Sequence, residues 1–311
     1  MIILEESFMT VPIFLELVEA KAKVASVFPF FLGLYFSWYY THQLNWGLSL
    51  MFFIAMLLFN MAVDAHDNYS DYKNATAKAD EWKQKTNIIG VNNLSMTGIR
   101  NLILSFAGVA TVFGIAMTVM TGWPLLIMGI FCFAVGYFYA AGPRPISTTP
   151  FGEFFSGITM GFVIMLITVY INTASSGLFT FTLFWQVLLA SGIAVFAISN
   201  IMLANNLCDA DEDQLLDRKT LVHYLGKQNG LRLFVLNYVF AYACLILSVG
   251  LHYLPYTSLL VLLSLPLVIK NTRQFLAKQV KKETFKFAVK NAMILAVFSI
   301  VCVGIGTIAN W

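Results

Sequence analysis

The sequence predicts an all-α integral membrane protein, and two observations support that prediction. Hydrophobic residues make up 59% of the 311 residues and charged residues only 11%, a balance too apolar for a domain that faces water on all sides. The apolar residues lie in runs of about 20, the length that a helix needs to cross hydrocarbon, whereas barrel strands are about 10 residues long and alternate. Helices satisfy their own backbone hydrogen bonds in lipid. We expect a single membrane domain over residues 1–311.

About nine membrane-spanning helices are expected, one from each long apolar run. Each run is close to the roughly 20 residues that cross a bilayer, and the two prolines that follow residue 142 end the fourth helix. In chain order the expected helices cover residues 24–42, 46–64, 100–120, 123–141, 153–173, 180–205, 232–251, 254–270 and 288–308.

The basic residues predict how these helices are oriented. Two Lys or Arg residues precede the first helix, five lie between the second and third, and one lies between the fourth and fifth. Four more lie between the sixth and seventh, and seven lie between the eighth and ninth or at the start of the ninth, which completes the 19. All of them fall on one side, which the positive-inside rule assigns to the cytoplasm. The N-terminus is therefore expected on the cytoplasmic side of the cell membrane, and Trp311 is expected on the outer side.

Two sets of oxygen-bearing side chains recur at helical spacing beside apolar runs. At about 100° per residue, offsets of 0, 4, 7 and 11 keep the first set in a stripe about 60° wide, and offsets of 0, 4, 8 and 12 keep the second on one slowly turning face. Both sets open toward the predicted cytoplasmic side, and we call them the two acidic ladders. The first ladder is Asn60, Asp64, Asp67 and Asp71, and the second is Asn205, Asp209, Asp213 and Asp217.

The ladders predict a bound cation, because carboxylates stacked on one helix face repel one another. Hard oxygen ligands with no neighbouring thiolate or imidazole set favour magnesium over zinc, and magnesium usually arrives with a phosphate. A single acidic cluster is usually only a solvated helix face. A charge at membrane depth costs at least about 2.5 kcal/mol, however, so two clusters of matching form favour a split site for metal and diphosphate.

The spacing of the ladders resembles the motifs of the UbiA superfamily of intramembrane aromatic prenyltransferases. The run from Asp64 to Asp71 is similar to the DxxDxxxD part of the first motif. The run from Asp209 to Asp217 is similar to the second motif, DxxxDxxxD. Three further pieces resemble the menaquinone branch, the 1,4-dihydroxy-2-naphthoate polyprenyltransferases known as MenA: Asp67-Asn68-Tyr69-Ser70-Asp71, residues 139–146 followed by Gly152-Glu153, and residues 205–209 followed by 217–221.

The resemblance implies a fold, a reaction and a set of site residues. The fold would be a UbiA-type bundle around a central cavity, in which two Mg²⁺ ions join the ladders to the diphosphate of a polyprenyl donor. The naphthoate would attack the allyl cation and lose its carboxylate, giving demethylmenaquinone. The implied metal ligands are Asp64, Asp67, Asp71, Asp209, Asp213 and Asp217, of which Asp67, Asp71, Asp209 and Asp213 are the catalytic residues. The implied substrate contacts are Asn60, Asn68, Tyr69, Lys73, Tyr139, Arg144, Asn205, Asn206, Arg218 and Lys219.

Among these contacts, Lys73 and Arg144 are the strongest expectations for binding phosphate oxygens or the acceptor carboxylate. The ring faces of Tyr69 and Tyr139 are expected to stabilise the allyl cation by cation–π attraction.

The chain departs from the branch pattern at a few positions, and these departures leave the acceptor open. Val63 and Cys208 stand where Asn and Arg are common, Asn68 follows Asp67 where the order is typically reversed, and Asp217 replaces a common Gly. A prenyltransferase for another aromatic acceptor, such as 4-hydroxybenzoate, is therefore the main alternative. A secondary transporter would also carry intramembrane carboxylates, but near the midplane and not among basic residues toward one face.

Overall fold

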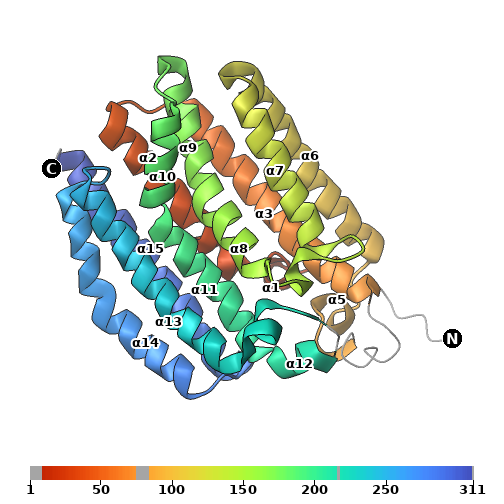
Figure 1. Ribbon diagram of the computed structural model, residues 1–311. Helices are drawn as coiled ribbons and strands as arrows, with labels where there is room; N and C mark the ends of the chain where they lie inside the picture. The colour runs from red at the N-terminus through yellow and green to blue at the C-terminus, as the bar shows by residue number, and fades with distance from the viewer. Residues whose placement is uncertain (1–8, 75–83, 216–217, 310–311) are drawn as a thin grey trace.

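The computed structural model describes residues 9–74, 84–215 and 218–309, and within these ranges every regular element is a helix (Figure 1). The all-α prediction is confirmed. The long helices are α2 (Val24–Thr41), α3 (Trp46–Asn74), α6 (Met96–Thr121), α7 (Trp123–Ala140), α9 (Ile164–Thr173), α10 (Phe181–Ala190), α11 (Gly192–Cys208), α13 (Leu221–Gly250), α14 (Leu265–Ala277) and α15 (Lys281–Ala309). The short elements are α1 (Val11–Leu17), α5 (Ile88–Val91), α8 (Gly152–Ser156), α12 (Ala210–Leu215), the 3-10 turns Ala20–Lys23, Ile146–Thr148, Ala174–Ser176 and Tyr256–Ser264, and a π-helical segment, Gly157–Val163.

The predicted count of nine spans is close to what the structure holds. By length and composition, seven helical segments of the described chain can cross a membrane, and α10 and α11, bent by 53° at their junction, make an eighth. The remaining expected span corresponds to α2, which has only 18 residues and contains Pro29. α2 is also less uniformly apolar because it ends in a run of Trp, Tyr and Thr. The second expected span stopped at residue 64, whereas α3 continues to Asn74 and carries the whole first ladder.

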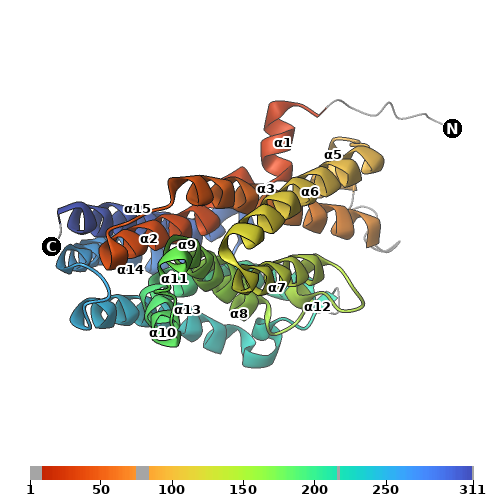
Figure 2. The ribbon, with the colours of Figure 1, turned by 90° about the horizontal axis from the view of Figure 1, so that it is seen from above.

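The helices form two groups joined by a central set (Figures 1 and 2). One group contains α3, α6 and α7, with α3 packed against both of the others. The second group contains α13, α14 and α15, and α11 packs against α13 and α15. Between the groups, α2 contacts α9 and α15, and every residue of α9 is buried. The two ladders are thus carried by different groups.

Polar side chains link the helices in the bundle interior. The Asn200 amide of α11 donates to the Phe234 carbonyl of α13 at 2.8 Å and accepts from Asn237 at 2.8 Å. Asn172 of α9 donates to Ser49 of α3 at 3.2 Å. Such bonds satisfy groups that would be costly to leave unpaired in an apolar interior, and they fix the register of the packed helices.

The segment from α8 through the π-helical turn into α9 lies against α11 at very close range. A Cβ placed on Gly161 would lie 2.6 Å from both Cα and N of Val195, and one placed on Gly157 would lie 2.9 Å from the Val195 carbonyl oxygen. Only glycine allows this backbone approach. The close contact sets α8, at the start of the segment, beside the C-terminal part of α11.

Candidate active site

The two acidic ladders end at the same end of the bundle, where α1, α5 and α12 also lie (Figure 1). Asp71 lies in the last turn of α3, and Asp209 is the C-terminal cap of α11. The C-terminus of a helix carries partial negative charge, so carboxylates at two such ends create a strongly negative region. Such a region favours a bound cation, and metal binding by the ladders stays a prediction.

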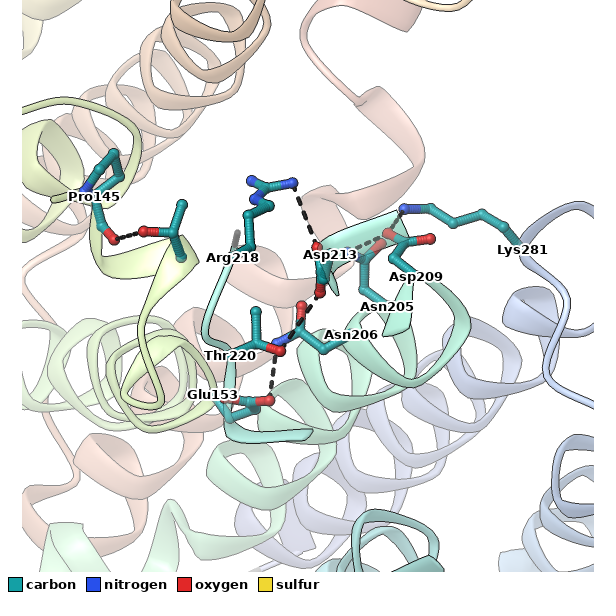
Figure 3. Close-up of polar contacts among 10 residues, drawn as sticks. Pro145, Glu153, Asn205, Asn206, Asp209, Asp213, Arg218, Thr220 and Lys281 are labelled. Atoms are coloured by element: carbon teal, nitrogen blue, oxygen red, sulfur yellow. Dashed lines mark hydrogen bonds and ion pairs between the residues drawn. The ribbon is translucent and has the colours of Figure 1, made fainter. Parts of the chain in front are cut away.

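Three ladder carboxylates are paired with basic side chains from other segments. Asp64 pairs with Lys23, which ends the 3-10 turn before α2, and Asp209 pairs with Lys281, the first residue of α15. Asp213 lies 3.8 Å from the Arg218 guanidinium, measured from its Oδ1 to Nη1 (Figure 3). The protein's own cations therefore neutralise part of the negative charge at this end.

Arg218 brings the two ladders together. Besides its contact with Asp213 of the second ladder, its guanidinium interacts electrostatically with Asp67 and Asp71 of the first. Lys281 likewise interacts with Asp71 as well as with its partner Asp209. Carboxylates of both ladders therefore lie within electrostatic range of the same two basic side chains.

Asp213 is the more enclosed of the two second-ladder carboxylates that the structure describes, with 4% of its surface exposed. Its Oδ2 accepts a hydrogen bond from the Thr220 hydroxyl at 3.4 Å, and its backbone carbonyl accepts from the Arg218 N–H at 2.8 Å. Burial raises the pKa of Asp213 to about 6, although the nearby Arg218 opposes the rise. One ladder step earlier, the Asn205 amide donates to Asp209 Oδ2 at 3.1 Å.

Tyr139 completes the space between the ladders from the end of α7. Its hydroxyl donates to the Met202 sulfur at 3.0 Å, and it interacts electrostatically with Asp64 and Asp67 of the first ladder and with Arg218. An aromatic side chain therefore lies near the ladders, and a role for its ring in stabilising a cation stays a prediction.

Three substrate contacts expected on α3 lie off the face that carries the first ladder. Tyr69 packs with the apolar cluster formed by Leu17 and Ile89, and Lys73 lies over the Tyr69 ring with Nζ 5.9 Å from its centre. The Asn68 amide donates to the Leu17 carbonyl at 3.3 Å and to the Asp64 carbonyl at 3.2 Å. These contacts attach α1 to α3, and a substrate role for the three side chains stays a prediction.

The remaining expected residues are spread around the site. The Asn60 amide contacts the Met160 sulfur at 3.8 Å, deeper along α3. The Lys219 backbone N–H donates to the Thr148 carbonyl at 3.1 Å, which holds the segment after α12 against the turn after α7. The Asn206 amide donates to Glu153 at 2.8 Å. Asp217 lies outside the described residues.

Arg144 lies in the exposed segment between α7 and the turn at Ile146–Thr148. We expect Arg144→Ala to raise the Michaelis constant for at least one substrate by about 10-fold, since a guanidinium that binds an anion is lost. The thermal midpoint in detergent should stay unchanged, because an exposed Arg contributes little to stability. Steady-state kinetics with each substrate varied in turn would measure this effect. Unchanged Michaelis constants for both substrates would reject the role of Arg144.

The structure adds Lys23 and Lys281 to the site, and it places Glu153 beside the ladders, a residue that the sequence named only within a segment resembling the menaquinone branch. Both lysines were interpreted only as markers of membrane orientation. Their position directly before an apolar helix, on the same side as the ladders, was a usable signal. Glu153 follows the Gly-Pro-Arg-Pro segment in the sequence but has no periodic partner that would reveal it.

The donor set fits a hard divalent cation such as Mg²⁺. Among the described residues, no three Asp, Glu, His or Cys side chains converge closely enough to enclose one ion between them. The ladders instead offer separate carboxylates on two facing helix ends, with basic groups already paired to them. The residues that would hold metal are Asp64, Asp67, Asp71, Asp209 and Asp213.

Comparison with known proteins decides the family. The model of the UbiA prenyltransferase family matches residues 26–300. The chain belongs to this family. It is a prenyltransferase and a multi-pass membrane protein, and the transporter alternative is excluded. A 1,4-dihydroxy-2-naphthoate octaprenyltransferase from Bacillus subtilis (strain 168) is 30% identical over 231 residues, covering 73% of this chain and 70% of the relative.

Solved structures of UbiA homologues share the fold. The apo structure of a homologue from Aeropyrum pernix K1 superposes with a TM-score of 0.71 at 14% identity, covering 91% of this chain and 98% of the other. A homologue from Archaeoglobus fulgidus, solved bound to GPP and Mg²⁺, gives a TM-score of 0.61 at 12% identity and covers 96% and 99% of the two chains. At identities this low, the structural similarity shows that this chain has the same helical fold as these homologues.

Proposed function

We propose that this prenyltransferase transfers a polyprenyl group from a polyprenyl diphosphate to 1,4-dihydroxy-2-naphthoate. The acceptor loses its carboxylate, and the product is demethylmenaquinone in its hydroquinone form. The single observation that supports the proposal is that Arg218 contacts Asp213 of the second ladder and lies within electrostatic range of Asp67 and Asp71 of the first, between two helix ends where a diphosphate and its metals would bind. The naphthoate acceptor is supported by the name of the Bacillus subtilis relative.

The reaction requires Mg²⁺ in this proposal, with two ions shared by the ladders. Mg²⁺, when bound, neutralises the diphosphate so that the allylic C–O bond can ionise. The homologue from Archaeoglobus fulgidus that was solved with GPP and Mg²⁺ supports the use of this metal. The carboxylates of both ladders, including Asp217, hold the ions, and the Arg218 guanidinium binds the outer phosphate oxygens.

The prenyl chain and the acceptor lie on the membrane side of the ladders. The isoprenoid tail is held among the apolar helices and needs no aqueous channel. Tyr139 shields the allyl cation from water and stabilises it with its ring face. In this proposal the site lies on the cytoplasmic side of the cell membrane. The basic residues Lys23, Arg218 and Lys281 gather at this end of the bundle, and basic residues are enriched on the cytoplasmic side.

The acceptor and the metal are tested in one assay with the purified protein in detergent. We expect prenyl transfer from one polyprenyl diphosphate to 1,4-dihydroxy-2-naphthoate, and we expect it to stop when EDTA removes Mg²⁺ and to resume when Mg²⁺ is restored in excess. Product would be identified by mass spectrometry, which also reports the loss of CO₂.

The same assay with 4-hydroxybenzoate separates the alternatives. Prenylation of the benzoate alone would support prenyl transfer but contradict the assignment of the naphthoate as acceptor. The benzoate is tested because Asn68 and Cys208 depart from the pattern of the menaquinone branch. Equal rates with and without EDTA would overturn the magnesium requirement.

A further inference from the structure

Glu153 is a buried carboxylate beside the ladders to which the proposed reaction has so far given no role. It lies in the first turn of α8, and only 4% of its surface is exposed. Its Oε1 accepts a hydrogen bond from the Asn206 amide at 2.8 Å (Figure 3). Its Oε2 is also buried, and no other described residue donates a hydrogen bond to it, although the carboxylate interacts with the backbone N–H of Glu153 itself. One oxygen is therefore fixed by Asn206, and the other has no side-chain donor among the described residues.

The surroundings of Glu153 hold it rigidly. The Ser199 hydroxyl of α11 donates to its backbone carbonyl at 2.8 Å, and Asn206, which binds its side chain, is itself only 3% exposed. Just after α8, Gly157 lies so near that a Cβ there would be 3.2 Å from the Ser199 Cβ. A buried carboxylate oxygen without a donor costs free energy, so a fixed and unpaired oxygen points to a ligand that supplies the donor.

The location of Glu153 narrows the identity of that ligand. Its carboxylate interacts electrostatically with Asp213 of the second ladder and with Tyr139. Its partner Asn206 precedes the ladder residue Asp209 by about one turn of α11, so it lies on the membrane side of the ladder carboxylates Asp209 and Asp213. A diphosphate at the ladders would place its allylic carbon on this side, and the ring that attacks this carbon must lie beside it.

We propose that Glu153 is a catalytic residue whose Oε2 accepts the proton of the acceptor hydroxyl next to the carbon that is alkylated. The assignment rests on the function proposed above. The ligand must offer a proton donor to Oε2, because a carboxylate oxygen accepts hydrogen bonds and does not donate them. A ring hydroxyl of the acceptor meets this condition, whereas its carboxylate, which carries no proton, does not.

The proton and electrons balance without any further reagent. The allylic C–O bond breaks and the diphosphate leaves with its electron pair. As the carboxyl-bearing ring carbon bonds to the allylic carbon, the adjacent hydroxyl passes its proton to Glu153 and becomes a ketone. The bond to the carboxylate then breaks, CO₂ departs, and its electron pair restores the aromatic ring while the oxygen takes the proton back from Glu153. The product is the hydroquinone form of the prenylated ring.

The test uses Glu153→Gln in the full chain, purified in detergent with Mg²⁺. Gln keeps an oxygen for the Asn206 amide but cannot accept the proton. We expect transfer at pH 7 to fall by about 10²-fold or more, the usual contribution of a general base. The rate should recover as the pH rises toward the pKa of a free aromatic hydroxyl, near about 10, because solvent then removes the proton. Binding of farnesyl thiodiphosphate with Mg²⁺ should stay within about 2-fold of the unmodified protein.

Two further variants make the outcome decisive. Glu153→Asp keeps a shorter base, so it should lose less activity than Gln and show no recovery at high pH. Glu283→Gln changes an exposed carboxylate paired with Lys278 at 2.8 Å, and it should have no effect. Transfer by Glu153→Gln at the unmodified rate, a fall that does not depend on pH, or an equal fall in farnesyl thiodiphosphate binding would each overturn the proposal.

Failure of the proposed function is visible separately, before any variant is made. If the unmodified protein prenylates 4-hydroxybenzoate but not the naphthoate, the acceptor assignment is lost, and the Glu153 variants are then compared with the benzoate, whose hydroxyl also lies beside the alkylated carbon. If the unmodified protein prenylates neither acceptor, both proposals fail together.

Discussion

Asp67→Asn and Asp213→Asn are each expected to reduce prenyl transfer by about 10³-fold or more, which corresponds to about 4 kcal/mol of transition-state stabilisation. Asp67 belongs to the first ladder and Asp213 to the second, so the two variants test both sides of the site. Asn keeps the size of Asp and one oxygen but removes the negative charge that holds a divalent cation. The loss should be the same from either side, because the diphosphate and its metals are expected to bridge both helix ends. Initial rates at saturating donor and acceptor, with Mg²⁺ in excess, would measure it.

A matched control lies on the same short helix as Asp213. Glu212 is exposed and is adjacent to Asp213 in the sequence, so Glu212→Gln removes one negative charge from a side chain that does not line the cavity shared by Asp213 and Arg218. We expect this variant to keep its activity. The two ladder variants and the control should all insert into the membrane and keep the thermal midpoint of the unmodified protein. The stability of the bundle does not depend on half-buried or paired carboxylates near helix ends. Full activity in Asp67→Asn or Asp213→Asn would remove that residue from the metal site.

The ladders could be predicted because they depend on one helix each. The spacing from Asn60 to Asp71 places the side chains on one face of any α-helix, whatever surrounds it. The same reasoning also shows a limit of motif transfer. Tyr69 and Lys73 belong to the resembling segment, but the helical period turns them away from the ladder, and in the structure they pack beside α1 and α5.

The pairing of individual ladder residues with their partners could not be predicted, because tertiary packing decides which side chains meet. Lys23 is 41 residues from Asp64, Lys281 is 72 residues from Asp209, and Glu153 is 53 residues from Asn206. No periodic pattern joins such pairs. The bend between α10 and α11 and the π-helical segment after α8 were also missed, since hydropathy reports only that a run is apolar and long enough to span.

Gly161→Ala is expected to destabilise the bundle by about 1–3 kcal/mol, the usual cost of forcing a methyl group into a fully packed interior. The new Cβ would lie 2.6 Å from the backbone of Val195 and 3.0 Å from the Ala194 carbonyl carbon. Backbone atoms of α11 cannot turn aside as a flexible side chain can, so the two helices must separate. The measurement is the thermal midpoint in detergent, followed by intrinsic Trp fluorescence.

Gly114→Ala in α6 is the control that isolates packing from helix propensity. No atom lies within 4 Å of a Cβ placed at Gly114, so the substitution adds only the preference of a helix for Ala over Gly. That preference should stabilise the protein by about 0.5–1 kcal/mol, opposite in sign to the effect at Gly161. The Gly161 variant should also lose prenyl transfer, because displacing α11 separates Asn206 from Glu153 and moves the second ladder relative to Arg218. Equal midpoints for the two variants would contradict the close approach of the π-helical segment to α11, and with it the rigid placement of Glu153 in the site.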